Sequence, residues 1–162
     1  MPIDKEKTKT QPRPKAYFVR IDTMNGKPLL EKRSCIELVT TFLFNFRRQQ
    51  WFDLIGFVVL PREMQLIIIP RSITVNMLAS RLERETAPLL AKLMPIDGPV
   101  WDQDIYAEPL DGIETVRSRL YMMQATPVKL RLALAPDLYD FSSANPRYAD
   151  ELDKMERINP ST

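Results

Sequence analysis

Residues 52–70 read FDLIGFVVLPREMQLIIIP, and this stretch decides the fold. Two apolar runs, 52–60 and 63–69, are separated only by Pro61 and Arg62, a connection too short for a crossover helix. The runs are therefore predicted to pair as an antiparallel hairpin, and both are apolar enough to be central strands. Because side chains alternate along a strand, Glu63 and Gln65 are expected on one face of the second strand.

The segments on either side of the hairpin alternate between strand and helix patterns. Residues 15–22 alternate, with Phe18 and Arg20 on one side, and end before the turn signal Asn25-Gly26. Helical spacing of apolar residues marks 34–49, 74–94 (with a kink or an early stop at Pro88) and 111–125, while 100–109 reads as a fourth strand. This order predicts an α+β fold, a ferredoxin-like sandwich with a central antiparallel sheet and helices on one face.

Both ends of the chain are polar. Residues 1–14 are predicted to form a flexible basic tail and residues 147–162 a C-terminal tail, around a single domain at 15–146. The N-terminus has no apolar core of the kind a secretory signal needs. The longest apolar run, near Leu54–Leu60, is far short of the roughly 20 residues of a membrane span. We therefore expect a cytoplasmic protein without membrane contact.

The composition excludes several classes of active site. The 162 residues contain no histidine, a single cysteine (Cys35) and four glycines. Without imidazole there is no Ser-His-Asp or Cys-His catalysis and no His-based zinc site. One cysteine forms neither a disulfide within the chain nor a metal cluster, and no glycine-rich phosphate loop is present.

The charges are segregated along the chain although the net charge is only +2. Residues 1–72 carry 13 basic and 7 acidic side chains, residues 95–116 carry 6 acidic and no basic ones, and residues 117–132 carry 4 basic and no acidic ones. Such blocks can build a basic face on a nearly neutral protein, which favours a polyanionic partner.

Three segments, in order and with comparable spacing, resemble the HUH single-tyrosine transposases, in the branch of REP-associated tyrosine transposases. GFVVLPREMQLIIIP (56–70) is similar to that family's strand-turn-strand, in which a His-hydrophobic-His triplet follows a proline. GPVWDQDIYAEPL (98–110) resembles its Gly-x-x-Trp-x-x-x-x-Tyr segment. YMMQATPVKLRL (121–132) and DLYDFSSA (137–144) resemble its helix ending in Asn-Pro-Val-Lys and its later aromatic-Ser-Ser motif.

The resemblance implies a chemistry that this chain no longer supports. In the family the two imidazoles hold a divalent metal that polarises a phosphate of single-stranded DNA, and a helix tyrosine attacks the phosphorus. The imidazole positions fall on Glu63 and Gln65, the tyrosine on Met122, and a polar residue that assists the metal on Thr126. All four depart from the pattern, so the resemblance implies a degenerate, DNA-binding member without nicking activity and without a cofactor.

Two alternatives remain open. Tyr121 precedes the family's tyrosine position by one residue, a rotation of roughly 100° that aligns it with Arg117 and Gln124. An alignment slip or a π-bulge would return it to the site, and with Mg²⁺ or Mn²⁺ at Glu63 the chain would be an active DNA nicking and rejoining transposase. The other alternative is a protein-interaction module that uses the acidic block 95–116.

If the family's fold is kept, single-stranded or hairpin DNA is the expected partner, and the chain is expected to be a monomer or homodimer. Lysine and arginine would neutralise phosphates while an aromatic side chain stacks on unpaired bases. The candidates are Arg62, Arg71, Trp101, Arg117, Arg119, Lys129 and Arg131. Lys15 and Arg13 could add a basic arm. The competing interpretation is a solvated or ion-paired surface residue for each arginine and core packing for Trp101.

Overall fold

The computed structural model describes residues 15–158, so the predicted basic tail at 1–14, with Arg13, lies outside the described residues. The strands are β1 (Ala16–Asp22), β2 (Phe52–Val59), β3 (Glu63–Pro70) and β4 (Tyr106–Leu110). They form one sheet in the order β2-β3-β1-β4, and every neighbouring pair is antiparallel. The predicted α+β class is confirmed, and the hairpin turns at Pro61 and Arg62 as expected.

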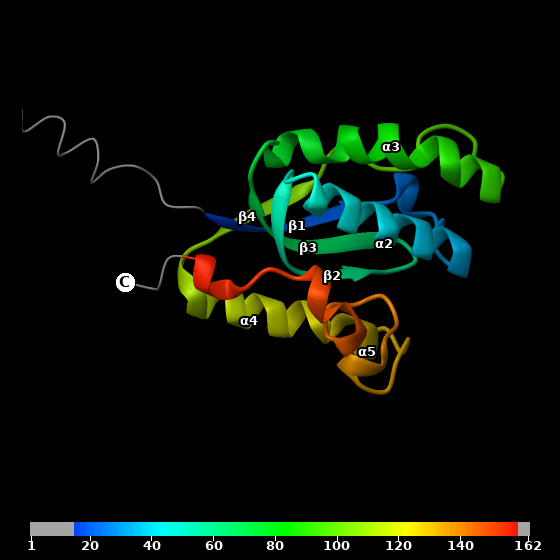
Figure 1. Ribbon diagram of the computed structural model, residues 1–162. Helices are drawn as coiled ribbons and strands as arrows, with labels where there is room; N and C mark the ends of the chain where they lie inside the picture. The colour runs from blue at the N-terminus through cyan, green and yellow to red at the C-terminus, as the bar shows by residue number, and fades with distance from the viewer. Residues whose placement is uncertain (1–14, 159–162) are drawn as a thin grey trace, which may run out of the picture.

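The helices are α2 (Arg33–Arg48), α3 (Leu78–Leu93), α4 (Gly112–Gln124) and the short α5 (Thr126–Lys129). Short 3-10 turns cover Met24–Gly26, Val75–Met77, Pro136–Leu138, Pro146–Glu151 and Met155–Arg157. Among residues 15–158, no helix combines the length and the apolar character needed to cross a bilayer. Figure 1 shows α2 and α3 on one side of the sheet and α4 on the other.

Helices therefore cover both faces of the sheet, whereas the sequence predicted one covered face. Along β3, Leu66 and Ile68 belong to the core under α2 and α3, while Ile67 and Ile69 belong to the core under α4. A strand that is apolar on both faces needs a cover on both. Val116 and Met123 are the buried residues through which α4 supplies the second cover.

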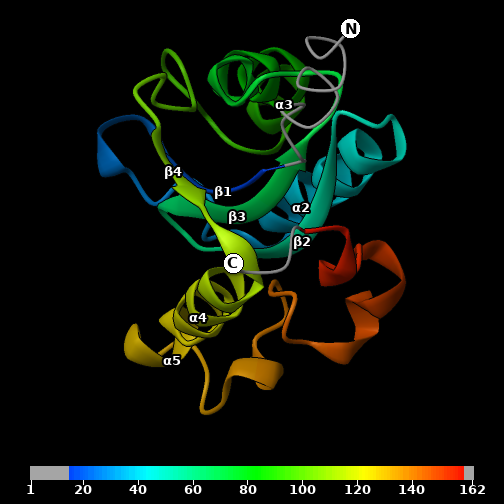
Figure 2. The same ribbon diagram turned by 90° about the vertical axis from the view of Figure 1, so that its left-hand side faces the viewer.

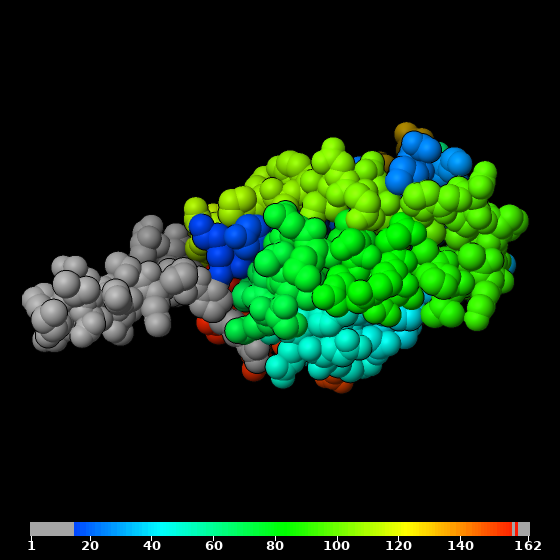
Figure 3. All heavy atoms as spheres, turned by 90° about the horizontal axis from the view of Figure 1, so that it is seen from above, coloured from blue at the N-terminus to red at the C-terminus, as the bar shows by residue number. Residues whose placement is uncertain are grey.

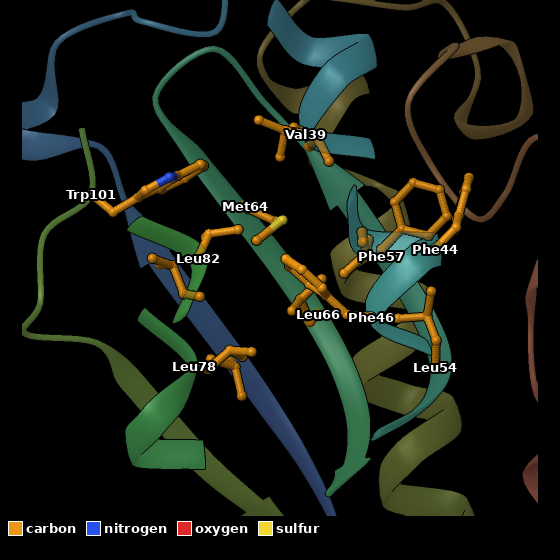
Figure 4. Packing of buried hydrophobic residues seen from close by; sticks show 14 of the residues in the cluster. Val39, Phe44, Phe46, Leu54, Phe57, Met64, Leu66, Leu78, Leu82 and Trp101 are labelled. Carbon is orange, nitrogen blue, oxygen red and sulfur yellow. The ribbon is translucent and has the colours of Figure 1, made fainter. Parts of the chain in front are cut away.

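The larger core lies between the sheet and the pair α2 and α3. Figure 4 shows side chains of all these elements in contact, with Phe44 edge-on to Phe57 at 5.4 Å between ring centroids. The residues labelled there are Val39, Phe44, Phe46, Leu54, Phe57, Met64, Leu66, Leu78, Leu82 and Trp101. In Figure 3, α3 lies between α2 and the segment that leads from α3 to β4.

α3 runs from Leu78 to Leu93 through Pro88, so the predicted early stop is wrong. Proline removes one backbone donor, which leaves the carbonyl of Arg84 without its helical partner. Pro88 and Arg84 are both exposed, and water can hydrate that carbonyl. The fourth strand begins at Tyr106 rather than at Val100. Trp101 forms only an isolated bridge with Thr23, and in the turn that follows the Asp102 carboxylate accepts a hydrogen bond of 2.9 Å from Asp104 N.

α4 approaches β2 closely at Gly56. A Cβ there would lie closer than van der Waals contact to Leu120 Cδ1 and 3.1 Å from Met123 Cε. The pairing of β2 with β3 also shifts register between Leu54 and Gly56. The missing side chain therefore lets α4 pack directly on β2.

β2 lies at the edge of the sheet, which contradicts the prediction that both hairpin strands are central. Its free edge is covered by the C-terminal segment, residues 139–158, which lies beside β2 in Figure 2. Val59 N donates to Phe141 O at 2.9 Å, and Ser143 N donates to Phe57 O at 2.9 Å. This second set of partners allows an edge strand to be apolar and buried without exposing open hydrogen-bonding groups.

The part of the predicted C-terminal tail that the structure describes packs against the domain. Tyr148 is 9% exposed and Ile158 is 3% exposed. Asp153 N donates to Leu54 O at 2.7 Å, and the Asp153 carboxylate accepts hydrogen bonds from Arg47 Nε and Nη2 at 2.9 and 3.0 Å. These few buried and ionic contacts are enough to dock a segment whose composition is mostly polar.

Candidate nucleic-acid interface

An open cleft of about 420 Å³ lies where α4 and α5 meet the β3-β1-β4 part of the sheet. We call it the α4 cleft. The sheet contributes side chains from three strands, and the two helices contribute the rest. Its lining residues are Phe18, Arg20, Gln65, Tyr106, Arg119, Met122, Met123, Thr126 and Lys129.

The positions that the resemblance singled out converge on this cleft. Gln65, Met122 and Thr126 line it together although they come from β3, α4 and α5. Glu63 precedes Gln65 on the same strand face, and Gln65 Nε2 donates a hydrogen bond of 2.7 Å to Glu63 Oε2. The hydroxyl of Thr126, at the start of α5, donates to the carbonyl of Met122 in the last turn of α4 at 3.4 Å. These positions, which are far apart in the sequence, therefore lie together in the structure.

These donor atoms do not fit a divalent metal ion. The amide of Gln65 turns a donor toward Glu63 and occupies one of the two carboxylate oxygens. Within residues 15–158, no three Asp, Glu, Cys or His side chains gather closely enough to hold a metal ion. Mg²⁺ and Mn²⁺ bind oxygen ligands and keep several of their waters, and a single carboxylate beside an amide makes a weak site for either ion without a substrate phosphate.

Tyr121 lies outside the α4 cleft. Its side chain is 77% exposed, whereas Met122, one position later, lines the cleft. α4 is a regular α-helix from Gly112 to Gln124, so no bulge rotates the phenol toward β3. As placed, the hydroxyl of Tyr121 does not share a site with Glu63 and Gln65.

Two arginines, two aromatic rings and one carboxylate form a connected group between α4 and the strands β1 and β4. Arg119 Nη2 donates to both Oε1 and Oε2 of Glu108 at 2.8 Å, and its guanidinium lies 4.3 Å from the Phe18 ring centroid. Tyr106, 43% exposed, donates its hydroxyl to Glu108 Oε2 at 2.8 Å. Arg20 lies over the Tyr106 ring at 5.5 Å.

The hydrogen bonds within this group shift the pKa values of Glu108 and Tyr106. The hydrogen bond from Tyr106, and after it the one from Arg119, holds the pKa of Glu108 below its usual range. The same hydrogen bond, now donated to a carboxylate, raises the pKa of Tyr106. Near neutral pH the group therefore consists of a carboxylate, a guanidinium and a neutral phenol.

The remaining predicted cations are scattered. Lys129 lines the α4 cleft and takes part in no ion pair with another described residue. Arg117 pairs with Glu114 at 3.1 Å on the exposed side of α4. Arg131 is exposed just after α5, and Lys15 pairs with Asp111 at 3.3 Å.

Two predicted arginines lie away from the cleft, at opposite ends of β3. Arg62 Nη1 donates to the carbonyl of Gly26 at 3.0 Å beside the hairpin turn. Arg71 follows β3 and pairs with Asp53, in a separate hollow that Arg47 and Arg48 also line. Each arginine in that hollow is bound to a carboxylate, which is the arrangement of a structural ion-pair cluster.

Trp101 is wrong as a candidate for base stacking. Its side chain is 0% exposed, and its Nε1 donates a hydrogen bond of 2.9 Å to Thr86 Oγ1 in α3. A buried indole offers no face to a nucleotide, so the competing interpretation, core packing, is the one that the structure supports.

Sequence reasoning missed Phe18, Arg20 and Tyr106. Tyr106 is the tyrosine of the segment that resembles Gly-x-x-Trp-x-x-x-x-Tyr, and the alternation of 15–22 already placed Phe18 and Arg20 on one strand face. The sequence near these three residues does not show that they lie beside α4. Only the pairing of β1 with β4, which sets Arg20 opposite Tyr106, brings them together.

No family model matches this sequence, and neither does any curated protein. A solved structure does match: that of a REP-associated tyrosine transposase bound to a REP hairpin, with a TM-score of 0.64 and 17% sequence identity. The match covers 93% of this chain and 89% of that chain. The chain therefore shares the fold of that transposase. At 17% identity the likeness shows the fold and not the chemistry of the cleft.

Proposed function

We propose that this chain is a DNA-binding protein with a transposase fold that binds structured single-stranded or hairpin DNA in the α4 cleft without cutting it. One observation carries the proposal. Arg119, Lys129 and the half-exposed Tyr106 line the same cleft as Gln65 and Met122. The means of binding a nucleic acid are thus retained where the groups that would cleave it are replaced.

The binding chemistry follows from the residue types. The guanidinium of Arg119 and the ammonium of Lys129 can each neutralise a backbone phosphate, with release of condensed counterions. The ring of Tyr106 offers a face on which an unpaired base can stack. Unpaired bases occur in single strands and in hairpin loops, which is why these DNAs are expected to bind better than a plain duplex.

The lack of cleavage follows from the replaced groups. Attack on phosphorus requires an activated oxygen nucleophile, and the thioether of Met122 has none to offer. Glu63 and Gln65 are hydrogen-bonded to each other. Under this proposal they hold no metal ion that would polarise the phosphate. The proposal therefore assigns the cleft a binding role alone.

A gel-shift series tests the binding. Hairpin, linear single-stranded and duplex oligonucleotides are titrated at several salt concentrations, and the affinity is expected to fall steeply as salt rises. The double variant Arg119→Gln, Lys129→Gln should bind markedly more weakly. Arg84→Gln, on α3 across the sheet, removes a cation from outside the cleft and should bind like the wild type. A lack of binding at low salt, or binding independent of salt, would refute the proposal.

A separate assay tests the lack of cleavage. Labelled hairpin DNA is incubated with the protein and Mg²⁺ or Mn²⁺, and denaturing gels are searched for a covalent protein–DNA adduct. We expect none. An adduct that forms with the wild type and disappears in Tyr121→Phe would establish an active transposase instead.

A further inference from the structure

The ion pair between Glu108 and Arg119 has a consequence for how the α4 cleft binds DNA, and this inference rests on the proposed function. We propose that Glu108 competes with DNA phosphates for Arg119, so that a phosphate must displace this carboxylate before the guanidinium can bind it. Glu108 would thereby set both the affinity and the salt dependence of the cleft.

In the pair of Arg119 and Glu108, the carboxylate binds the guanidinium as an external anion would. Both carboxylate oxygens of Glu108 accept from Nη2 of Arg119 at 2.8 Å. Such charge-assisted bonds are shorter and stronger than neutral ones, and a phosphate offers the same pair of acceptor oxygens to a guanidinium. A DNA strand in the cleft would therefore seek the donors that Glu108 now occupies.

The surroundings hold the guanidinium in place, whereas the carboxylate of Glu108 is held only by its hydrogen bonds to Arg119 and to the half-exposed Tyr106. Arg119 rests on the ring of Phe18 at 4.3 Å, and Phe18 is itself buried, with 6% of its surface exposed. Glu108 lies on β4, the edge strand, and its side chain is 35% exposed. Rotation of Glu108 toward solvent would break its hydrogen bonds to Arg119 and Tyr106, and it would free Arg119 without disturbing the core.

The other cations near the cleft are less closely held. The side chains of Arg20 and Asp22 are 43% and 39% exposed at a separation of 3.2 Å, and those of Arg117 and Glu114 are 57% and 71% exposed. Water and salt screen such pairs strongly, so they hinder an incoming phosphate little. In the Arg119–Glu108 pair the arginine side chain is only 24% exposed. Competition by an internal carboxylate is therefore strongest at Arg119.

The test compares two variants that make the same change of charge. Glu108→Gln should bind hairpin DNA about tenfold more tightly at low salt, and the slope of log K against log salt should steepen by about one unit. The control Glu114→Gln lies in the same acidic block but opposes the more exposed Arg117. It should change the affinity by less than about twofold. Glu108→Ala should behave like Glu108→Gln, and melting curves verify that each variant is folded.

A double-mutant cycle separates local competition from a general loss of negative charge. In an Arg119→Gln background, the gain from Glu108→Gln should vanish, because the contested guanidinium is gone. If the wild type binds DNA and Glu108→Gln binds no tighter, or if the gain persists without Arg119, this inference fails while the proposed function stands. If the wild type binds none of the DNAs, the proposed function itself fails.

Discussion

Gln65 and Glu63 lie on one face of β3 and bond to each other, Nε2 to Oε2, at 2.7 Å. These are the two positions at which the resemblance implies a pair of metal-binding imidazoles. Two ring nitrogens would both offer lone pairs to an ion, whereas an amide N–H directed at a carboxylate satisfies the pair internally. The two side chains share one strand face, and their polar groups bond to each other.

This pair predicts how the chain responds to metal ions. The melting temperature of the wild type should not change when millimolar Mn²⁺ is added. The double variant Glu63→His, Gln65→His should gain a metal-dependent increase, about 2.7 kcal/mol in the free energy of unfolding at a concentration 100 times Kd. Thermal melts with Mn²⁺, then with excess EDTA, provide the measurement. A wild-type protein that is stabilised by Mn²⁺ and returns to its original melting temperature with EDTA would contradict the prediction.

Tyr106 should contribute to binding through its ring rather than through its hydroxyl. Tyr106→Leu is expected to weaken single-stranded DNA binding by about 1–3 kcal/mol, the usual contribution of one stacked base. Tyr106→Phe keeps the ring and should stay close to the wild type. Fluorescence anisotropy with a labelled oligonucleotide measures both variants. Tyr121→Leu is the matched control, since that ring is exposed but outside the cleft; a larger loss in this control would place the bound base on α4 instead.

Asp153 should anchor the C-terminal segment to β2. Its carboxylate accepts from Leu54 N at 2.8 Å and from two nitrogens of Arg47. Asp153→Asn is expected to lower the free energy of unfolding by about 1–3 kcal/mol, because the partly buried guanidinium of Arg47 loses the carboxylate that it donates two hydrogen bonds to and keeps the more distant Glu151, at 3.6 Å. Chemical denaturation measures the loss, and limited proteolysis should cut within 144–158 more rapidly. Asp150→Asn, at an exposed position of the same segment, should change neither.

Tyr139 gives the fold a dependence on alkaline pH. Burial, and after it the charge of Asp140, raises the pKa of Tyr139 to about 12, and its hydroxyl donates to Val59 O at 2.7 Å. Because the folded protein holds this proton more tightly than the unfolded chain, the stability contributed by the neutral phenol is complete below about pH 10. It is then lost between about pH 10 and pH 12, by at most about 1.4 kcal/mol per pH unit.

The comparison with Tyr139→Phe isolates this group from the other residues that titrate at high pH. The variant should be less stable than the wild type by about 1 kcal/mol near neutral pH, since the hydrogen bond to Val59 is lost. The difference should shrink as the pH passes 10. Urea denaturation at several pH values measures both proteins. Two curves that stay parallel up to pH 12 would show that the phenol does not carry the effect.

The hairpin at residues 52–70 was predictable because its evidence is local. Two apolar runs joined by two residues have few ways to pair, and the structure confirms the turn at Pro61 and Arg62. The position of β2 at the sheet edge was not predictable in the same way. Its second neighbour is the C-terminal segment, some 80 to 100 residues further along the chain, and no local pattern marks that contact.

The candidate site, too, was predictable only in part. The sequence places Gln65, Met122 and Thr126 at comparable positions of a known motif, and the structure brings them into one cleft. The sequence does not tell which of Trp101 and Tyr106 is exposed, since both are aromatic residues in one polar stretch. The distinction arises because Thr86 of α3 accepts the indole N–H of Trp101 inside the core, while β4 carries Tyr106 outward.

The amino-acid sequence by itself determined the order of strands and helices and the absence of any imidazole-based chemistry, because periodicity, turn residues and composition are properties of short stretches or of the whole count. The tertiary structure alone decided that α4 covers the second sheet face, that Trp101 is buried and that Glu108 binds Arg119. Each of these depends on how separate elements pack, which no single stretch of sequence specifies.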